Sequence, residues 1–223
     1  MISVILPYWK RPEVTHRSLV LYQKHYEGVL DFEVILVDDG SHDFDASYPW
    51  LRIEKLPKKE TAKNPCVPIN HGVRVSKGNI IVLSNPEILH NSPVLPQMLE
   101  ELQRMGEMGY VLAACWYELD KKWHCRSDLV ADGWHHNIRQ PKGSGFHFCG
   151  MMYRSLWDKT GGFDEAYRDG WCYDDPDFVN RVAKAGGVFK VRDDLVVEHI
   201  REGALANWNL PDNRNIFEAK WPG

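Results

Sequence analysis

Residues 32–41 read FEVILVDDGS, an apolar run that ends in two aspartates and a glycine. The run from Glu33 to Val37 is typical of a strand buried on both faces, which the polar residues after it cannot continue. An earlier apolar run, Ser3 to Leu6, predicts a second strand that Pro7 ends. Between the two, Pro12 suits a first helical turn, and side chains of one helical face recur at spacing four up to Tyr26. The chain therefore begins with a β-α-β unit.

Strand and helix patterns continue to alternate after this unit. We predict strands at 52–56, 79–84, 109–119 and 146–154, one or two strands in 188–200, and helices at 92–106 and 175–185. This order predicts an α/β fold with a mostly parallel central sheet covered by helices on both faces. Neither an internal repeat nor a linker divides residues 1–223, so we expect a single domain.

The composition excludes several classes of protein. Lys and Arg number 27 against 31 Asp and Glu, and this balance gives no global attraction to nucleic acid or to anionic membranes. The apolar runs fall far short of the roughly 20 residues that a membrane span needs. Five cysteines without a C-x-x-C pair indicate reduced thiols, not a disulfide framework or a zinc knuckle. We expect a soluble cytoplasmic protein with no membrane partner.

Acidic and amide side chains stand where ligands of open α/β sheets bind, beyond the carboxyl ends of strands. The three positions are Asp38-Asp39, the Asn85-Pro86-Glu87 that ends the run IIVLS, and Asp174-Asp175 on a later connection. Taken alone, each has a simpler explanation, since Asp-Asp-Gly-Ser is a common turn and a strand-end glutamate is usually solvated.

In their order and spacing, four segments resemble the GT-A fold (Rossmann-like) nucleotide-diphospho-sugar glycosyltransferases, most closely family 2. SVILPYWKRPE with FEVILVDDGS is similar to that family's first β-α-β unit, and PINHGVRVSKGNIIVLSNPE to its Asn-x-Gly and metal-binding DXD segments. GGFDEAYRDGWCYDDPDFVNRVAKAGG resembles its acceptor segment, with a galactosyltransferase-like Gly-Trp. The resemblance implies a nucleotide-sugar half, 1–120, and an acceptor half with a C-terminal tail, 121–223.

The resemblance assigns a metal site to residues 85–87 and to a late histidine. Glu87 matches the second acid of DXD and His199 the late ligand, a pair that suits Mn²⁺, with Mg²⁺ as the alternative. Asn85 departs from the pattern, because it offers a neutral carbonyl where the family has an acid.

The same resemblance assigns a nucleotide-sugar site to the first strand ends. Asp38 and Asp39 would receive the base and the ribose, because carboxylates accept hydrogen bonds from imide N–H and hydroxyl groups. The other members of this predicted site are Pro7, Tyr8, Arg11, Asn70 and Asn85. Ile69 departs from the family, which often has arginine at this position.

Asp175 matches the family's general base, which takes the proton of the acceptor hydroxyl, and Asp174 would hydrogen-bond the acceptor. Asp175 before Pro176 also reads as a helix N-cap, and the two roles are compatible. Gly170 and Trp171 would contact the acceptor. The irregular segment 120–145, with Trp123, Trp134, His135 and His136, would form a lid, and the tail with Arg214, Phe217 and Trp221 has no predicted role.

These features together predict a metal-dependent, inverting glycosyltransferase that uses a UDP-sugar. The acceptor could be a glycan, a small molecule, a protein or a modified nucleobase. Two alternatives remain open at this level: a degenerate GT-A fold that binds nucleotide or sugar without turnover, and a sugar-phosphate nucleotidyltransferase.

Overall fold

A computed structural model describes residues 1–119, 121–127, 149–200 and 211–222. The strands are β1 Ile2–Tyr8, β2 Phe32–Asp38, β3 Leu51–Lys55, β4 Ile80–Ser84, β5 Ile88–Leu89, β6 Gly109–Tyr117, β7 Lys122–Cys125, β8 Cys149–Tyr153 and β9 Val188–His199. The helices are α1 Pro12–Tyr26, α2 Cys66–Val75, α3 Val94–Met105, α5 Arg154–Thr160, α6 Asp174–Lys184 and α7 Arg214–Lys220, with a 3₁₀ turn at Glu165–Tyr167.

One sheet joins strands from both halves of the chain, in the order β3-β2-β1-β4-β8-β6-β9-β5, with β7 beside β6. The predicted α/β fold is confirmed. Neighbours pair in parallel among β3, β2, β1 and β4 and between β6 and β9, as β-α-β connections require. The sheet is mixed overall, because β8, β5 and β7 enter through antiparallel pairs.

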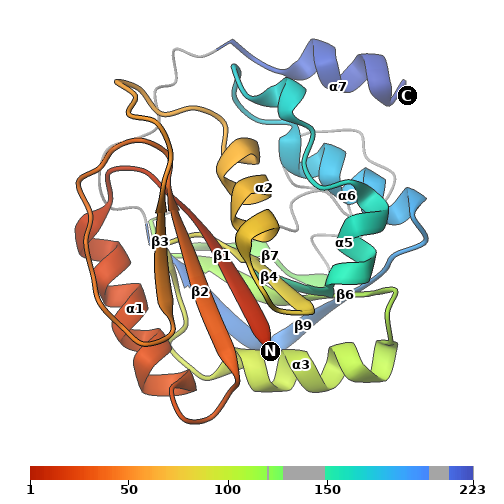
Figure 1. Cartoon of the computed structure of the whole chain (residues 1–223). Coiled ribbons are helices and arrows are strands. Elements are labelled where there is room, and N and C mark those ends of the chain that lie inside the picture. The colour runs from red at the N-terminus through yellow and green to blue at the C-terminus, as the bar shows by residue number, and fades with distance from the viewer. Residues whose placement is uncertain (120, 128–148, 201–210, 223) are drawn as a thin grey trace.

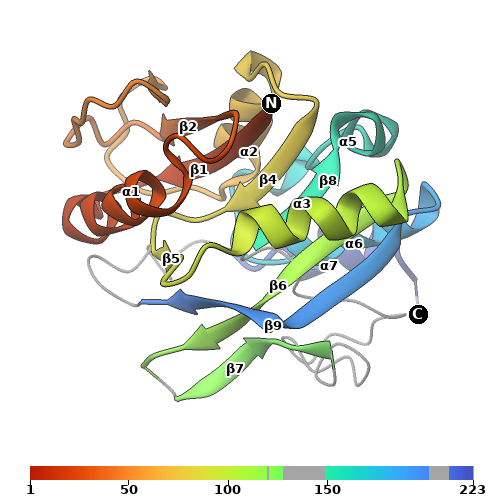
Figure 2. The same ribbon diagram turned by 90° about the horizontal axis from the view of Figure 1, so that it is seen from below.

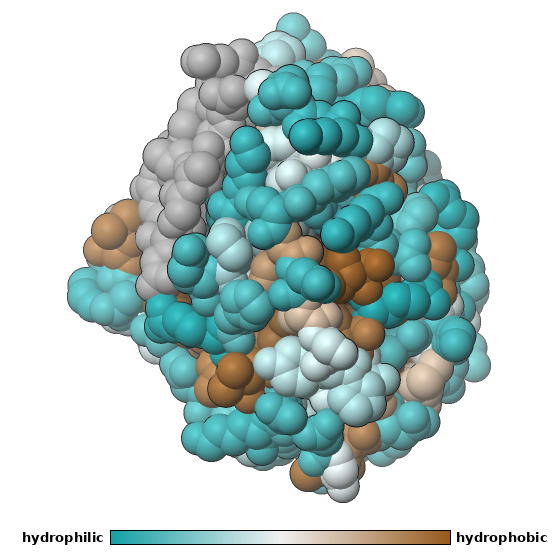
Figure 3. Space-filling model, turned by 60° about the vertical axis from the view of Figure 1, so that its left-hand side comes forward, coloured by the Kyte–Doolittle hydropathy of each residue, from teal (hydrophilic) through white to brown (hydrophobic). Residues whose placement is uncertain are grey.

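Helices cover both faces of the sheet, as Figures 1 and 2 show. In the view from below, α1 and α3 lie in front of the sheet, while α2, α5 and α6 lie behind it. Large hydrophobic side chains from all these layers form the main core, and few remain exposed, such as Val29 and Val188. The face drawn in Figure 3 is accordingly mostly hydrophilic, with hydrophobic residues in small areas. Every helix in the described ranges is too short or too polar to span a bilayer.

Several elements of the structure were not predicted from the sequence, among them the short strand β5 and the short helices α5 and α7. Residues 122–125, expected to be irregular, form β7 against the end of β6. Helix α2 was not expected, because Pro65, Pro68 and Gly72 weaken its pattern. Both prolines lie at or before the first turn, where a helix tolerates them.

The strand directions bring the carboxyl ends of β1, β2, β4, β6 and β9 to one edge of the sheet. Tyr8 lies opposite Asp38, Ser84 opposite Cys149, and Tyr117 opposite His199. The polar residues that follow these strands therefore gather at one edge, as predicted.

Gly72, the glycine of the Asn-x-Gly motif, lets α2 lie close on the sheet. A Cβ atom there would stand 2.6 Å from the Ile5 side chain and 3.1 Å from that of Val37.

We predict that Gly72→Ala lowers the free energy of unfolding by about 1–3 kcal/mol, because overpacking outweighs the better helix propensity of alanine. Urea denaturation measures it, with exposed Arg74→Ala on the same helix as the control. An unchanged or raised stability of Gly72→Ala would show that α2 can shift to admit the methyl group.

Candidate active site

Glu87 and His199 meet at the carboxyl edge of the sheet. Glu87 lies in the turn between β4 and β5, and Ile88 of β5 pairs with His199 of β9. The Glu87 carboxylate consequently lies 3.8 Å from His199 Nε2, and the Ile200 N–H donates to the Glu87 carbonyl at 3.0 Å. The Arg11 guanidinium forms an ion pair with the same carboxylate oxygen. Three residues predicted from separate segments are thus in contact.

These neighbours keep Glu87 ionised. Burial raises the pKa of the Glu87 carboxyl, but the interaction with His199 and the charge of Arg11 outweigh it, so that the net pKa lies below its usual value. A carboxylate held in this state can serve as a cation ligand at neutral pH.

The donor set at this edge fits a divalent ion in part. Glu87 and His199 supply a hard oxygen and an imidazole nitrogen, the mixture that suits Mn²⁺. The described residues contain no cluster of three or more His, Cys, Asp and Glu that could hold a metal ion. Arg11 competes for the same oxygen of Glu87. The Asn85 carbonyl accepts the Ile88 N–H at 3.0 Å, and its side chain is partly buried.

Two of the predicted nucleotide ligands turn inward. Tyr8 is fully buried, its ring packs on Phe44 at 5.1 Å, and its hydroxyl donates to Asp43 at 2.8 Å. Burial and the Asp43 charge raise the pKa of the Tyr8 hydroxyl. Asp38 accepts hydrogen bonds at both oxygens, from the N–H groups of residues 40, 41 and 42 and from the Ser41 hydroxyl, at 2.7–3.0 Å. Both side chains shape the loop after β2, and their contacts to the nucleotide stay predictions.

Asp39, the next predicted nucleotide ligand, is also buried. Its carboxylate pairs with Lys59 at 2.5 Å. Burial raises the pKa of Asp39, and Lys59 offsets part of this shift. Pro7, half-buried, lies beside Val37 at the end of β1.

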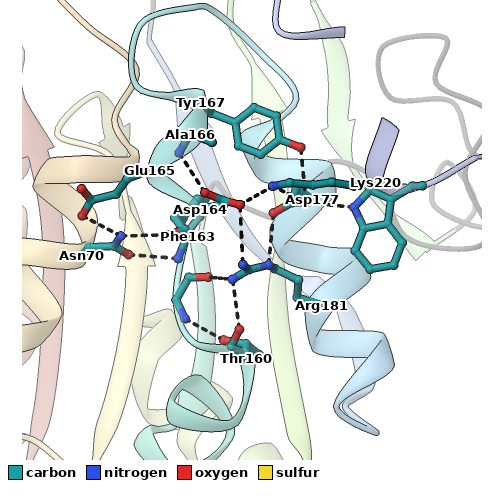
Figure 4. A network of polar contacts seen from close by, with 12 residues as sticks. Asn70, Thr160, Phe163, Asp164, Glu165, Ala166, Tyr167, Asp177, Arg181 and Lys220 are labelled. Atoms are coloured by element: carbon teal, nitrogen blue, oxygen red, sulfur yellow. Dashed lines mark hydrogen bonds and ion pairs between the residues drawn. The ribbon is translucent and has the colours of Figure 1, made fainter. Parts of the chain in front are cut away.

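The Asn70 side chain is bonded to the protein at both ends. Its amide nitrogen donates to the Phe163 carbonyl at 2.8 Å, and its oxygen accepts the Phe163 N–H at 2.9 Å. A further bond reaches Glu165 at 3.2 Å. Figure 4 shows these hydrogen bonds between the Asn70 side chain and the GGFDE segment, and the nucleotide contact of Asn70 stays a prediction.

Helix α6 begins at Asp174, and the two residues before it, Cys172 and Tyr173, have positive φ angles of 59° and 70°. Such a pair is costly in non-glycine residues and is typical of functional sites. Asp175 is not the N-cap: that position is Tyr173, without a side-chain cap bond, and Asp175 and Pro176 lie inside the first turn. The segment places two adjacent aspartates at the head of a helix.

The environment makes both aspartates more basic than usual. Burial raises the pKa of Asp175 well above its ordinary value, and the charge of Asp174 adds to this. Burial also raises the pKa of Asp174, although the Asn64 amide, which donates to it at 2.8 Å, acts the other way. The second oxygen of Asp174 is buried with no hydrogen-bond partner among the described residues. A pair of this kind is chemically suited to accept a proton.

Asp175 lines two cavities. One, of about 170 Å³, lies at the strand ends beside Ser84, Asn85 and Phe163. The other, of about 130 Å³, lies beside Trp171, Tyr173 and Arg214. The predicted donor residue Asn85 and the predicted acceptor residue Trp171 thus lie on two sides of one carboxylate.

The C-terminal segment binds directly behind this site. Trp171 and Asp212 form a β-bridge, and buried Asn213 donates to the carbonyls of Tyr167 at 2.9 Å and Cys172 at 3.1 Å. A Cβ atom at Gly170 would stand 2.1 Å from the Asn213 amide oxygen. Gly170 therefore permits the close approach of this segment. The structure thus gives a packing reason for glycine here, and the predicted contact of Gly170 with the acceptor stays a prediction.

The sequence reasoning missed the network around Asp177 (Figure 4). Asp177 is fully buried, accepts hydrogen bonds from Trp221 Nε1 at 2.8 Å and from the Tyr167 hydroxyl at 3.3 Å, and pairs with Arg181 at 3.3 Å. Lys220 of α7 joins this network through Asp164 and Asp177. The sequence held one indication of this network: Asp177 is a third acid, three residues after Asp174, at a helix position that the structure buries.

The predicted lid is only partly within the described ranges. Trp123 lies on β7 with its ring 5.2 Å from that of Trp116. Trp134, His135 and His136 lie outside the residues that the structure describes.

The C-terminal tail packs against Tyr173. The Phe217 ring lies 5.4 Å from the Tyr173 ring, and the Arg214 guanidinium lies 5.8 Å from the centre of the Tyr173 ring.

The raised pKa of Asp175 makes a prediction about stability. A group whose pKa is higher in the folded state than in the unfolded state weakens folding as pH rises from the unfolded to the folded pKa. Asp175→Asn removes this carboxyl, so the variant should gain on the order of 1 kcal/mol at neutral pH, less the screening that partial exposure allows. Thermal unfolding at acidic and at neutral pH checks it, with exposed Asp158→Asn as the control. A loss of stability at neutral pH would mean that the Asp175 carboxylate is a structural ligand.

Three comparisons with known proteins agree with this geometry. A family model described as the N-terminal domain of galactosyltransferase matches residues 128–201. The poly(ribitol-phosphate) beta-N-acetylglucosaminyltransferase TarP of Staphylococcus aureus is 29% identical over 114 residues, which cover 48% of this chain and 33% of TarP. The chain thus spans about a third of the length of that relative.

Solved structures show the same fold at low identity. TarS of S. aureus superposes with a TM-score of 0.67 at 14% identity, over 89% of this chain and 60% of that one. The mannosyltransferase PcManGT of Pyrobaculum calidifontis, in complex with GDP-Man and Mn²⁺, gives 0.59 at 15% identity, over 89% and 56%. The resemblance predicted from the sequence is confirmed: the chain has the GT-A glycosyltransferase fold, and the proteins that it is similar to are glycosyltransferases.

Proposed function

We propose that the protein is a glycosyltransferase that moves a sugar from a nucleotide diphosphate sugar to an acceptor hydroxyl, with inversion and with Asp175 as the general base. The observation that carries this proposal is the position of Asp175 between two cavities, one at the strand ends and one beside Trp171. A base must contact the attacking hydroxyl on the side away from the leaving group, and a carboxylate shared by two cavities meets this requirement.

The chemistry follows from the charges of the site. The acceptor hydroxyl attacks the anomeric carbon, its proton passes to Asp175, and the bond to the diphosphate breaks. Asp174 repels charge on Asp175 and so favours its protonation as the hydroxyl loses its proton. Arg11, which follows β1 at the same edge of the sheet, would provide a cation for the charge that develops on the diphosphate.

A divalent metal fits the same edge as a second source of positive charge. Glu87 and His199 would hold it, and a bound Mn²⁺ or Mg²⁺ would neutralise the leaving diphosphate. The neighbour PcManGT binds Mn²⁺ together with GDP-Man.

We propose UDP as the nucleotide of the donor and Asp39 as the residue that contacts it. GDP, the nucleotide bound by that neighbour, is the alternative, so a panel of donors must include both. For the acceptor we favour a glycan, because TarP is named for a polymeric acceptor.

A second candidate is a GT-A domain that binds its ligand without turnover. The ion pair of Arg11 with Glu87 favours it, because a guanidinium already neutralises the metal-ligand carboxylate. The two candidates differ in whether sugar transfer occurs, and a cytoplasmic location stays a prediction for both.

Asp175→Asn should lower kcat by about 10²- to 10⁴-fold with donor affinity unchanged, because an amide cannot accept the proton. In the native protein, kcat/KM should fall as pH decreases through an apparent pKa above that of an ordinary aspartate, since the pair must be ionised to act. Initial rates over a pH series with UDP- and GDP-sugars measure both effects, with Asp158→Asn as the control. Full activity in Asp175→Asn would remove Asp175 as the base.

Glu87→Gln should weaken donor binding in the presence of Mn²⁺ by roughly tenfold or more, because it replaces a charged metal ligand by a neutral one. Titration calorimetry with Mn²⁺ and with EDTA measures it, and Glu100→Gln on the exposed face of α3 is the control. With EDTA the variant should bind as the native protein does. If Glu87→Gln keeps its metal-dependent affinity, the metal is held elsewhere or not at all.

A further inference from the structure

A third cavity, between α5, α6 and α7, is not lined by Asp174 or Asp175. Its volume is about 510 Å³, and it is lined by side chains from all three helices. Four of these are cations: Lys159, Arg181, Lys184 and Lys220. Neither the donor site nor the base uses this cavity.

Two of the four cations are neutralised within the protein. Arg181 pairs with Asp177 at 3.3 Å and with Asp164 at 3.8 Å, and Lys220 pairs with the same two acids. Figure 4 shows this arrangement of two cations around two carboxylates. The charges of these four residues therefore balance one another within the protein.

The other two cations are not paired with an acid in the described part of the chain. Lys159 Nζ lies 3.4 Å from the Met108 sulfur, and Lys184 Nζ lies 5.9 Å from the centre of the Trp221 ring. Both lysines are exposed. The cavity therefore has a surplus of two positive charges at its rim, in a chain whose formal net charge is −4.

Besides these cations, an aromatic side chain, Trp221, lines the cavity. Trp221 is fixed by its N–H bond to Asp177 at 2.8 Å, so its ring is held while a face borders the cavity. Aromatic faces pack against the C–H faces of sugar rings, and ammonium groups bind phosphate or carboxylate. Charge and aromatic surface together fit a sugar chain that carries anions.

Helix α6 separates this cavity from the base. Asp177, Arg181 and Lys184 line the cavity, and at the 3.6 residues per turn of an α-helix Asp175 lies on the other side of α6, with Lys184 roughly 14 Å further along the axis. We propose that the cavity binds the anionic, non-reacting part of an acidic glycan acceptor, which is long enough to pass around the first turn of α6 so that its terminal hydroxyl reaches Asp175. This inference rests on the proposed function for the reacting end, but the binding itself does not depend on turnover.

The test is titration calorimetry of the whole protein without donor, at low and at physiological ionic strength. The probes are oligomers of equal length: a phosphodiester-linked sugar alcohol, an oligogalacturonate, neutral maltooligosaccharide and single-stranded DNA. At least one acidic glycan should bind roughly tenfold more tightly than the neutral one, with an affinity that salt weakens. The first two probes distinguish phosphate from carboxylate as the anion.

Lys159→Gln with Lys184→Gln should remove most of this preference, a loss of roughly tenfold for the acidic glycan and none for the neutral one. The matched control is Lys77→Gln with Lys190→Gln, which removes the same charge from exposed positions elsewhere. Equal affinities for acidic and neutral glycans, no binding of either, or an unchanged affinity in the cavity variant would overturn the proposal. Tighter binding of DNA with the same lysine dependence would replace the glycan by nucleic acid.

Transfer assays separate this proposal from the proposed function. Acidic-glycan binding that depends on the two lysines, with no transfer from any nucleotide sugar, would leave the cavity site standing and remove the glycosyltransferase activity. Sugar transfer with the same KM for acidic and neutral acceptors would support the glycosyltransferase activity and remove the cavity as an acceptor site.

Discussion

The buried carboxylate of Asp177 is the constraint on which the acceptor side of the molecule depends. A charge that is taken out of water must be paired and hydrogen-bonded, or it costs several kcal/mol. Asp177 meets this demand with Arg181 from its own helix, Tyr167 from the 3₁₀ turn, and Lys220 and Trp221 from the C-terminal segment. The nearby 3₁₀ turn and the C-terminal segment, 44 residues away in the sequence, are thereby fixed around the first turn of α6, and Asp175 is in that turn.

The same constraint explains how strain is tolerated beside the base. Cys172 and Tyr173 stay in the left-handed region because Asn213 holds the Cys172 carbonyl and Phe217 packs on the Tyr173 ring. Asn213 comes from the C-terminal segment that the Asp177 network secures. The geometry of the candidate base is therefore maintained by residues far from it in the chain, and none of them needs to contact the substrate.

The sequence could predict the sheet edge because strand order and direction follow from local patterns. Apolar runs that end in polar residues place Asp39, Asn85, Glu87 and His199 at the carboxyl ends of strands, and the structure brings Glu87 to His199. It could not predict which polar atoms are already used. Asn70 and Phe163 are 93 residues apart, and no local pattern shows that the amide of one is bonded to the backbone of the other. Asp38 shows the same limit in a different way: a turn in which both carboxylate oxygens accept hydrogen bonds from the loop has the same letters as a nucleotide ligand, and the nucleotide contact of Asp38 stays a prediction.

The two ends of the candidate site use charge in opposite ways. At Glu87, Arg11 and His199 lower the pKa, so the carboxylate stays ionised and available to a cation. At Asp175, burial and Asp174 raise the pKa, so the carboxylate gains affinity for a proton. Two acids with environments that push their pKa values apart are the arrangement expected when one group binds the leaving side and the other takes a proton from the attacking side. The sheet makes this separation stable, because Glu87 follows β4 whereas Asp175 heads a helix on one face of that sheet, and neither can relax toward the other without breaking an element.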